Sequence, residues 1–379
     1  MSVQVSYKKQ IIFGILIICI FLSVLEGFVR VYEIINPHCV FMDSEALETT
    51  SYLLSRIMCI DHDRTFSTLE FSVIPIPCAN QHYTTININS DNLRGKEILL
   101  DKSENTYRII MVGGSTVFGV VSSSDDKTIP GYLQKEFDLQ SEKEIEVING
   151  GFGNADSASE LYFIKNKFLA FNPDMIIWYH GWNDAENEIT RINYDKSEHS
   201  NECWYWPMSS SWRTPYLYDI VFWPDKPYIS DMPPYTKLLS ELQTKGKIEK
   251  ENILVRTELI ESRWNEMCSL SKENEIKSVI MIQPILGTGN KTFSIEEEKW
   301  LERPYEKTYL ETLESFAQNL KNLENKCDKT VDMRNVFDGI KEPLYMDMGH
   351  VTDRGNEIIA KKIHDEIYPI IHSVVENLP

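Results

Sequence analysis

Five residues in this sequence have the types and the spacing that acyl transfer requires. Ser115 follows two glycines, and its hydroxyl is a weak nucleophile that needs an adjacent base. His350 can accept that proton near neutral pH, and Asp347, three residues earlier, can hold the imidazole in the required tautomer. The backbone N–H groups of Ser115 and Gly151 and the side-chain amide of Asn183 can stabilise the oxyanion of a tetrahedral intermediate. We therefore predict a catalytic triad in which Ser115 is the nucleophile, His350 the base and Asp347 the residue that orients the base.

Each of these residues also has a common structural role, so none of them decides the matter alone. A serine after a tight turn often begins a helix as its N-cap, and the Asn-Asp pair at 183–184 is a frequent turn sequence. Asp338 is a reserve partner for His350, behind the aspartate of the same motif. His180 adjoins the asparagine motif, and we interpret it as a structural residue or part of a pocket wall.

Other chemistries are less well supported by the motifs. The glycines at 150, 151 and 153 could cradle a phosphate, but the sequence contains no G-x-x-x-x-G-K-[ST] motif, and an isolated G-x-G is weak. Asp347 and His350 could bind a metal, but no second His or Cys cluster accompanies them. The net charge of −19 argues against a nucleic-acid partner. We predict no cofactor, no metal and no nucleic acid.

Regular secondary structure must position these residues, and from residue 105 the sequence alternates between strand and helix patterns. Short apolar runs predict buried parallel strands, and amphipathic segments predict the helices between them. The predicted strands are 107–112, 145–150, 175–180, 278–284 and 329–333, and the predicted helices are 128–139, 156–171, 251–274, 304–325 and 353–375. This order predicts an α/β fold with a doubly wound parallel sheet. Because ligands bind at the carboxyl ends of such strands, we expect the candidate residues to converge there.

Four short motifs resemble the conserved blocks of the SGNH (GDSL-type) hydrolases, and they occur in that family's order. They are GGST at 113–116, NGGFGN at 149–154, GWND at 181–184 and DMGH at 347–350. The resemblance covers about 105–372. It implies a flavodoxin-like, three-layer α/β/α domain that hydrolyses esters or O-acyl groups without a metal, and it gives the five candidate residues the roles described above.

One residue departs from the family's pattern, because Gly114 stands where the nucleophile block usually has an aspartate. That aspartate is not the nucleophile, the base or an oxyanion donor. Its replacement by glycine is therefore expected to affect the local structure around Ser115 more than the mechanism. The segment INSDNLRG at 88–95 and an N-terminal anchor are also similar to those of a subset of prokaryotic surface members of the family.

The N-terminal segment predicts a membrane anchor. Lys8 and Lys9 precede an uncharged run, 11–25, and the apolar segment 10–32 can span a bilayer if its charged end lies near the interface. The positive pair predicts that residues 1–9 are cytoplasmic and that the catalytic domain is outside, as in a single-pass signal-anchor protein. A cleaved signal peptide is the alternative, although no small-residue cleavage site follows, and a buried core helix is another.

We divide the rest of the chain into an extracytoplasmic N-terminal extension, 33–104, and an SGNH hydrolase-like domain, 105–379. Residues 186–250 interrupt the strand–helix alternation with many aromatic residues and prolines, which predicts an insertion folded over the domain. Six of the seven cysteines lie outside the apolar N-terminal segment. An even number suits disulfides in an oxidising compartment, but the spacing leaves the pairing open.

Three functions are compatible with these features. The first is an ester hydrolase, esterase-like, lipase-like or an O-deacylase, that acts on a small-molecule, glycan or lipid ester. The second is an O-acyltransferase acting on surface glycans, which forms the same acyl-enzyme but passes the acyl group to a sugar hydroxyl. The third is a catalytically silent module that binds a glycan through its aromatic insertion. The presence of all five catalytic-type residues favours an enzyme, while the acyl group, the alcohol and the oligomeric state stay open.

Overall fold

The computed structural model describes most of the chain outside the predicted insertion. The described residues are 6–35, 44–47, 50–66, 68–71, 74–140, 144–186, 200–205, 253–302 and 306–375. Apart from residue 186 and the segment 200–205, the predicted insertion 186–250 therefore lies outside the described residues.

The centre of the molecule is a five-stranded parallel sheet. Its strands are β5 (Thr106–Gly113), β6 (Glu144–Gly151), β7 (Met175–His180), β9 (Lys277–Ile282) and β10 (Lys329–Asp332). Their spatial order is β10-β9-β7-β5-β6, and every neighbouring pair is parallel. Numbered along the chain, this is the flavodoxin-like order 2-1-3-4-5. The predicted doubly wound α/β sheet is confirmed.

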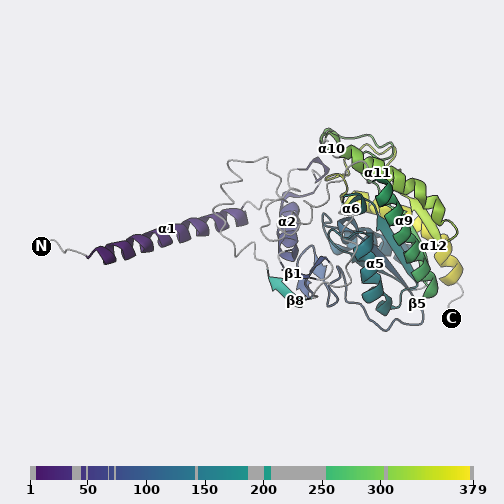
Figure 1. The fold of residues 1–379 in the computed structure, drawn as a ribbon, viewed down its shortest axis with the longest axis horizontal. Helices are drawn as coiled ribbons and strands as arrows, with labels where there is room; N and C mark the ends of the chain where they lie inside the picture. The colour runs from purple at the N-terminus through teal and green to yellow at the C-terminus, as the bar shows by residue number, and fades with distance from the viewer. Residues whose placement is uncertain are drawn as a thin grey trace.

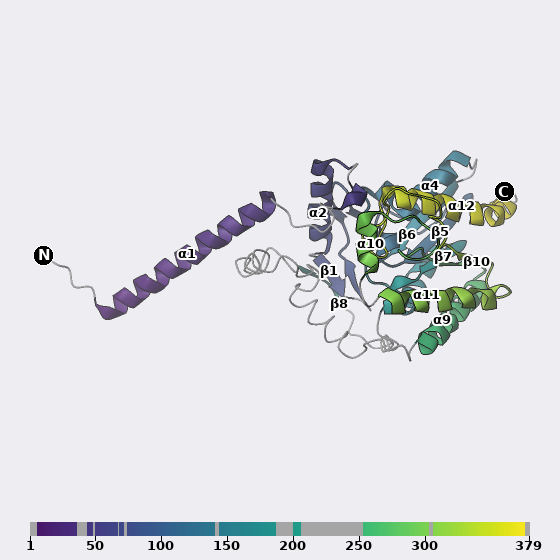
Figure 2. The same cartoon turned by 90° about the horizontal axis from the view of Figure 1, so that it is seen from above.

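Helices cover both faces of this sheet. One layer contains α4 (Ile129–Gln140) and α12 (Asp353–Val375), and the other contains α9 (Ile253–Glu273) and α11 (Glu306–Asn319) (Figure 2). In this second layer α5 (Ser157–Asn166) packs against α9 (Figure 1). Every residue of β5 and β7 is buried, as expected for strands that are covered on both faces. The three-layer α/β/α architecture follows from this arrangement.

Two of the predicted helices end earlier than the sequence pattern indicated. The prediction over 156–171 corresponds to α5 followed by a 3-10 turn at Phe168–Phe171, and the one over 304–325 to α11 followed by a 3-10 turn at Leu320–Leu323. In both turns the first and fourth residues are apolar and buried. Because residues i and i+3 eclipse one another in a 3-10 turn, this geometry directs both side chains toward the core.

The predicted extension, 33–104, has small elements of its own. They are a 3-10 turn at Glu45–Leu47, α2 (Tyr52–Phe66), β1 (Thr68–Phe71), β2 (Pro75–Pro77), β3 (Gln81–His82) and β4 (Asn87–Ile88). β1 pairs antiparallel with β2 and with β8 (Ser200–Tyr205), while β3 pairs with β4. A disulfide between Cys78 and Cys203 also links the extension to β8. The extension and this part of the predicted insertion are therefore joined by backbone pairing and by a covalent bond.

Short elements occupy the connections. They are α3 (Ser115–Phe118), a 3-10 turn at Asp125–Lys127, α6 (Trp182–Glu186) and α10 (Ile295–Leu301). Of these, α3 and α6 directly follow the neighbouring strands β5 and β7. Their first residues therefore lie at the carboxyl edge of the sheet, where the strand order reverses and ligands bind in such folds.

The N-terminal helix α1 (Tyr7–Ile35) is long and apolar (Figure 1). The most apolar 18-residue window of its segment Tyr7–Tyr32 has a mean hydropathy of 2.7, and no residue of that window is buried. A helix of this length and composition can cross a membrane, and a signal sequence meets the same criteria.

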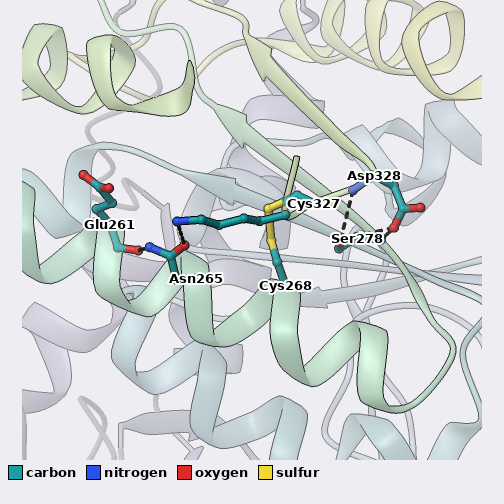
Figure 3. The surroundings of a disulfide bond; sticks show 7 residues. Glu261, Asn265, Cys268, Ser278, Cys327 and Asp328 are labelled. Atoms are coloured by element: carbon teal, nitrogen blue, oxygen red, sulfur yellow. Dashed lines mark hydrogen bonds between the residues drawn. A yellow bond between two sulfur atoms is a disulfide. The ribbon is translucent and has the colours of Figure 1, made fainter. Parts of the chain in front are cut away.

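The structure pairs four of the cysteines whose partners the sequence left open. Besides the Cys78–Cys203 bond, a second disulfide joins Cys268 of α9 to Cys327, which precedes β10 (Figure 3). Cys59 is also disulfide-bonded, and Cys19 in α1 is a free thiol.

Candidate active site

The nucleophile turn forms where β5 meets α3. β5 ends at Gly113 and α3 begins at Ser115, so the serine stands at the carboxyl edge of the sheet. A Cβ atom at Gly113 would collide with Val117 of α3, and a Cβ atom at Gly114 would collide with the side-chain amide of Asn183. Gly113 is therefore needed for the close approach of this turn to its neighbours, whereas a side chain at Gly114 would displace the Asn183 amide.

The structure brings the predicted serine, histidine and aspartate together. His350 Nε2 lies 2.7 Å from Ser115 Oγ, and His350 Nδ1 lies 2.7 Å from Asp347 Oδ2. The other carboxylate oxygen of Asp347 accepts hydrogen bonds of 2.8 Å from the backbone N–H groups of Gly349 and His350. The carboxylate is thus fixed in the turn before α12. It contacts Nδ1 of the His350 ring, while the Ser115 hydroxyl contacts Nε2.

The charges of the histidine and the aspartate support one another. Burial disfavours the imidazolium, but the negative charge of Asp347 and its hydrogen bond outweigh burial and raise the pKa of His350 above its ordinary value. Burial also disfavours the Asp347 carboxylate, yet the charge of His350 and hydrogen bonds from its ring and two backbone amides lower the pKa of Asp347. The aspartate therefore stays ionised when the histidine takes up a proton, which stabilises the imidazolium.

Asn183 reaches the nucleophile turn from α6. Its Nδ2 donates a hydrogen bond of 2.6 Å to the backbone oxygen of Ala155, in the loop after β6. The side-chain amide nitrogen carries two N–H groups, so the bond to Ala155 fixes one of them and the other can donate to a substrate oxygen. The contact of this amide with Gly114 brings it beside Ser115.

Gly151 lies against the nucleophile helix. A Cβ atom at this position would collide with the backbone nitrogen of Phe118, so the close packing of β6 on α3 requires a glycine. The Gly151 N–H donates a hydrogen bond of 3.0 Å to Asn149 Oδ1. If this N–H serves an oxyanion, it must be shared between Asn149 and the substrate.

Two alternatives from the sequence can be compared with this geometry. The reserve partner Asp338 accepts a hydrogen bond of 2.6 Å from the backbone N–H of Asn290, whereas Asp347 contacts the ring of His350. Among the residues that the structure describes, no group of three or more His, Cys, Asp or Glu side chains is arranged to hold a metal ion.

Sequence reasoning missed Arg94, a buried arginine of the extension that supports the nucleophile helix. Its guanidinium donates hydrogen bonds to the carbonyl oxygens of Phe118 (3.2 Å) and Gly119, at the end of α3. It also donates to the Thr85 carbonyl oxygen at 2.7 Å and pairs with Asp125 at 2.8 Å. The last carbonyl groups of a helix lack partners within the helix, so Arg94 satisfies them from outside. The resemblance noted for INSDNLRG gave no hint of this role.

A second residue of the extension, His62, was also missed. The neighbouring Asp61 anchors α2 by accepting hydrogen bonds from Thr85, from its N–H at 2.8 Å and its hydroxyl at 3.0 Å. Burial and the positive charges of His350 and Arg94 lower the pKa of His62 to about 4. The extension thereby brings an imidazole that is neutral at physiological pH within electrostatic reach of His350. A lone histidine in an aperiodic stretch carries no signal for such a position.

Comparisons with known proteins give matches among solved structures alone. No protein-family model and no curated protein matches this sequence. The chain is similar to a protein assigned to the lipolytic G-D-S-L family from Desulfitobacterium hafniense, at 13% identity and a TM-score of 0.37, over 68% of this chain and 98% of that one. It is also similar to a lipase/acylhydrolase from Enterococcus faecalis, at 17% identity and a TM-score of 0.40, over 69% and 95%.

An acetylxylan esterase from Geobacillus stearothermophilus is a third similar structure, at 15% identity and a TM-score of 0.39, over 70% of this chain and 96% of that one. At these identities and TM-scores, the similarity carries no argument about the activity of this chain.

Proposed function

We propose that this chain is a serine hydrolase of the SGNH type that cleaves esters through an acyl-enzyme on Ser115. The observation that carries the proposal is the contact chain from Ser115 Oγ through the His350 ring to Asp347, with 2.7 Å at each step. A hydroxyl, a base and an orienting carboxylate in this order activate a serine. A role for Ser115 as a simple helix cap is disfavoured, because the N-cap of α3 is Gly114 and Ser115 is the first residue inside the helix.

The reaction proceeds in two half-reactions. Ser115 Oγ attacks the acyl carbon while His350 Nε2 takes the hydroxyl proton, and the tetrahedral intermediate then expels the alcohol, whose oxygen receives that proton. Water next attacks the acyl-enzyme and gives a proton to the same nitrogen, and the carboxylic acid leaves as Ser115 regains its proton. Asp347 stays ionised throughout and stabilises the imidazolium in both halves.

Three donors form the proposed oxyanion hole. Ser115 is the first residue of α3, and the N–H of a first helical residue has no partner within its helix. The Asn183 amide is preorganised by its bond to Ala155, and the Gly151 N–H is the third donor. Donors of this kind are worth about 10²–10³ in kcat each, so they supply a large part of the acceleration.

We further propose that the substrate is a small-molecule, glycan or lipid ester encountered outside the cytoplasm. In this proposal α1 is a retained single-pass anchor, with residues 1–9 cytoplasmic and 33–379 outside. Lys8 and Lys9, before the apolar stretch, support this orientation. The disulfides support an oxidising compartment. The division at 104/105 into an extension and a hydrolase domain stays a prediction.

The test is hydrolysis of p-nitrophenyl acetate by the full chain in detergent. We expect Ser115→Ala to lower kcat by about 10⁴-fold or more, because the nucleophile is lost. Ser124→Ala, a matched control at a serine outside the site, should keep kcat within about twofold. Equal activity in the wild type and Ser115→Ala would contradict the proposal. Failure of the wild type to release acetate, together with acetyl transfer to a sugar acceptor, would identify the O-acyltransferase instead, and glycan binding without either would identify the silent module.

A further inference from the structure

A buried group of ionisable side chains includes Asp184, the residue that follows Asn183 in α6. His180, the last residue of β7, has Nε2 3.2 Å from Glu160 Oε2 and Nδ1 3.6 Å from Asp184 Oδ2. All three side chains are at most 4% exposed. Ionisable groups removed from water to this degree are costly unless they are paired, and the proposed reaction uses none of them. Their place next to the site therefore calls for an explanation.

Asp184 connects two elements at the edge of the site. Its Oδ1 accepts a hydrogen bond of 3.0 Å from the backbone N–H of Ser157 and a second one from the Ser157 hydroxyl. Arg263 of α9 donates to the same hydroxyl at 2.9 Å, and Arg256 donates to the Asp184 carbonyl oxygen at 2.9 Å. Since Ser157 begins α5 and Asp184 belongs to α6, these bonds fix the start of one helix relative to the other.

The proposed oxyanion donor spans the same two segments. Asn183 precedes Asp184 in α6, and its hydrogen-bond partner Ala155 lies two residues before Ser157. The Asn183–Ala155 and Asp184–Ser157 contacts therefore both join α6 to the segment that runs from β6 into α5. A movement of α6 relative to this segment would disturb both contacts together.

We propose that Asp184 is a positioning residue for the oxyanion donor Asn183, with His180 and Glu160 as the buried partners that hold it in place. This inference rests on the proposed function, because it assigns a role in the same reaction. Asp184 does not touch the reacting atoms. Its role is to keep the second N–H of Asn183 pointing toward the substrate oxygen. A displacement of about 1 Å at a reacting centre can cost about 10²-fold in rate, so a rigid link one residue away has a measurable effect.

The charges of the group suit this role. Burial disfavours ionised Asp184, but the nearby His180 ring, with Nδ1 3.6 Å from Asp184 Oδ2, and the charge of Arg263 lower the pKa of Asp184 overall. Burial raises the pKa of Glu160 to about 8, so Glu160 holds a proton at neutral pH. Asp184 is then a carboxylate, which accepts stronger hydrogen bonds from Ser157 than a neutral group would, without a second negative charge beside it.

The test is a double-mutant cycle on the full chain that combines Asp184→Asn with Asn183→Ala. We expect Asp184→Asn to lower kcat for p-nitrophenyl acetate about tenfold and to change KM less than about twofold, because the oxyanion contact exists in the transition state and not in the ground state. In the Asn183→Ala background the same substitution should lower kcat by less than about twofold. Equal factors in the two backgrounds, or an unchanged kcat in Asp184→Asn, would overturn the proposal.

The opposite edge of the sheet offers a matched control. Asp328 accepts hydrogen bonds from the backbone N–H of Ser278 at 2.9 Å and from its hydroxyl at 3.3 Å, the pattern that joins Asp184 to Ser157 (Figure 3). Asp328→Asn should lower the melting temperature but keep kcat within about twofold. A tenfold loss of kcat in this control would show that Asp184→Asn acts by general loosening and would overturn the positioning role.

A second variant covers the case in which Asp184→Asn does not fold. Ser157→Ala removes the hydroxyl that donates to Asp184 and accepts from Arg263, while it leaves every charge and the backbone bond to Asp184 in place. It should lower kcat about threefold when Asn183 is present and have no effect when Asn183 is alanine, since the backbone part of the Asp184–Ser157 link remains. A threefold loss in both backgrounds, or no loss in either, would contradict the proposal.

Labelling with a fluorophosphonate, which modifies an activated serine, separates the two proposals. If the wild type neither reacts with the probe nor hydrolyses an ester, the proposed function fails, and the positioning role fails with it. If the wild type reacts and Asp184→Asn reacts at the same rate, the positioning role fails while the proposed function stands. A slower reaction of Asp184→Asn supports both.

Discussion

His350 and His180 are both held between two polar partners, and the second partner decides what each ring can do. The ring of His350 lies 2.7 Å from Asp347 on one side and 2.7 Å from Ser115 Oγ on the other. Its side chain is 25% exposed, so a substrate can reach the hydroxyl beside it. A proton taken from that hydroxyl leaves behind an oxygen that can form a bond to carbon.

His180 has an aspartate on the same ring nitrogen and a carboxyl group where His350 has a hydroxyl. Asp184 and Glu160 lie 3.6 Å and 3.2 Å from its two nitrogens, and its side chain is fully buried. Burial lowers the pKa of His180, but Glu160 and Asp184 beside its ring outweigh burial and raise that pKa overall. A histidine next to an aspartate is therefore insufficient to mark a reactive site. His350 differs from His180 because substrate can reach its ring and because its second partner, the Ser115 hydroxyl, is a nucleophile.

The largest expected effect comes from removing the partly exposed ring of His350. His350→Ala should lower kcat by about 10⁴–10⁶-fold, because Ser115 then has no base, while the protein stays folded. The measurement is ester hydrolysis by the purified full chain, with thermal unfolding as the control for structure. A loss of less than tenfold would place the base elsewhere and would remove the contrast between the two histidines.

Asp347→Asn tests the role of the charge beside His350 through the pH dependence of kcat/KM. The carboxamide keeps the shape but not the charge, and kcat should fall about 10⁴-fold. In the wild type the base must be neutral, so kcat/KM is lost as the pH falls through the pKa of His350, which Asp347 raises above about 6.5. In the variant that charge is gone while burial remains, so the midpoint of the acid limb should move to lower pH. If the midpoint of the acid limb were the same in the variant and the wild type, a group other than His350 would control the loss of kcat/KM at low pH.

Removing the buried ring of His180 should lower the free energy of unfolding more than removing the ring of His350. His180→Ala leaves Asp184 and Glu160 without their shared partner in a site closed to water, and breaking a buried pair costs about 3–5 kcal/mol. Asp347, which is 34% exposed, can be hydrated when His350 is removed, so His350→Ala should cost less. Urea unfolding of both variants measures the difference. If His350→Ala were the more destabilising change, the assignment of structural and reactive histidines would be reversed.

Gly114→Ala is expected to have the smallest effect of the four. A Cβ atom at this position collides with the Asn183 amide, so the alanine should displace the proposed oxyanion donor and lower kcat about tenfold. The matched control is the same substitution in Asn183→Ala, where no amide remains to be displaced and kcat should change little. An identical loss in both backgrounds would instead point to distortion of the nucleophile turn itself.

The features that the sequence predicted correctly are local ones. β5 and β7 are continuous apolar runs, and a strand covered on both faces has to be apolar along its whole length. Asp347 and His350 are three residues apart, so a single turn brings them into contact. The convergence of Ser115 with that turn is the one long-range feature, and it follows because the carboxyl ends of parallel strands lie at one edge of the sheet.

The features that the sequence did not predict depend on contacts between distant segments. Arg94 bonds to backbone oxygens at the end of α3, and any residue supplies a backbone oxygen, so no side-chain pattern reveals it. Glu160 lies on an amphipathic helix, where a glutamate is usually solvated, and its burial beside His180 depends on how α5 packs in the fold. Gly114 stands where the SGNH hydrolases that this sequence resembles usually have an aspartate, and the Asn183 amide approaches it closely from α6.

The most direct measurement of the central claim is mass spectrometry of the full chain after reaction with a fluorophosphonate. We predict a single adduct on the peptide that contains Ser115, absent in His350→Ala and still formed in His180→Ala, because Asp347 and His350 activate the serine and the buried histidine does not. An adduct that persists in His350→Ala, one that forms on a different residue, or none on the wild type would contradict the account.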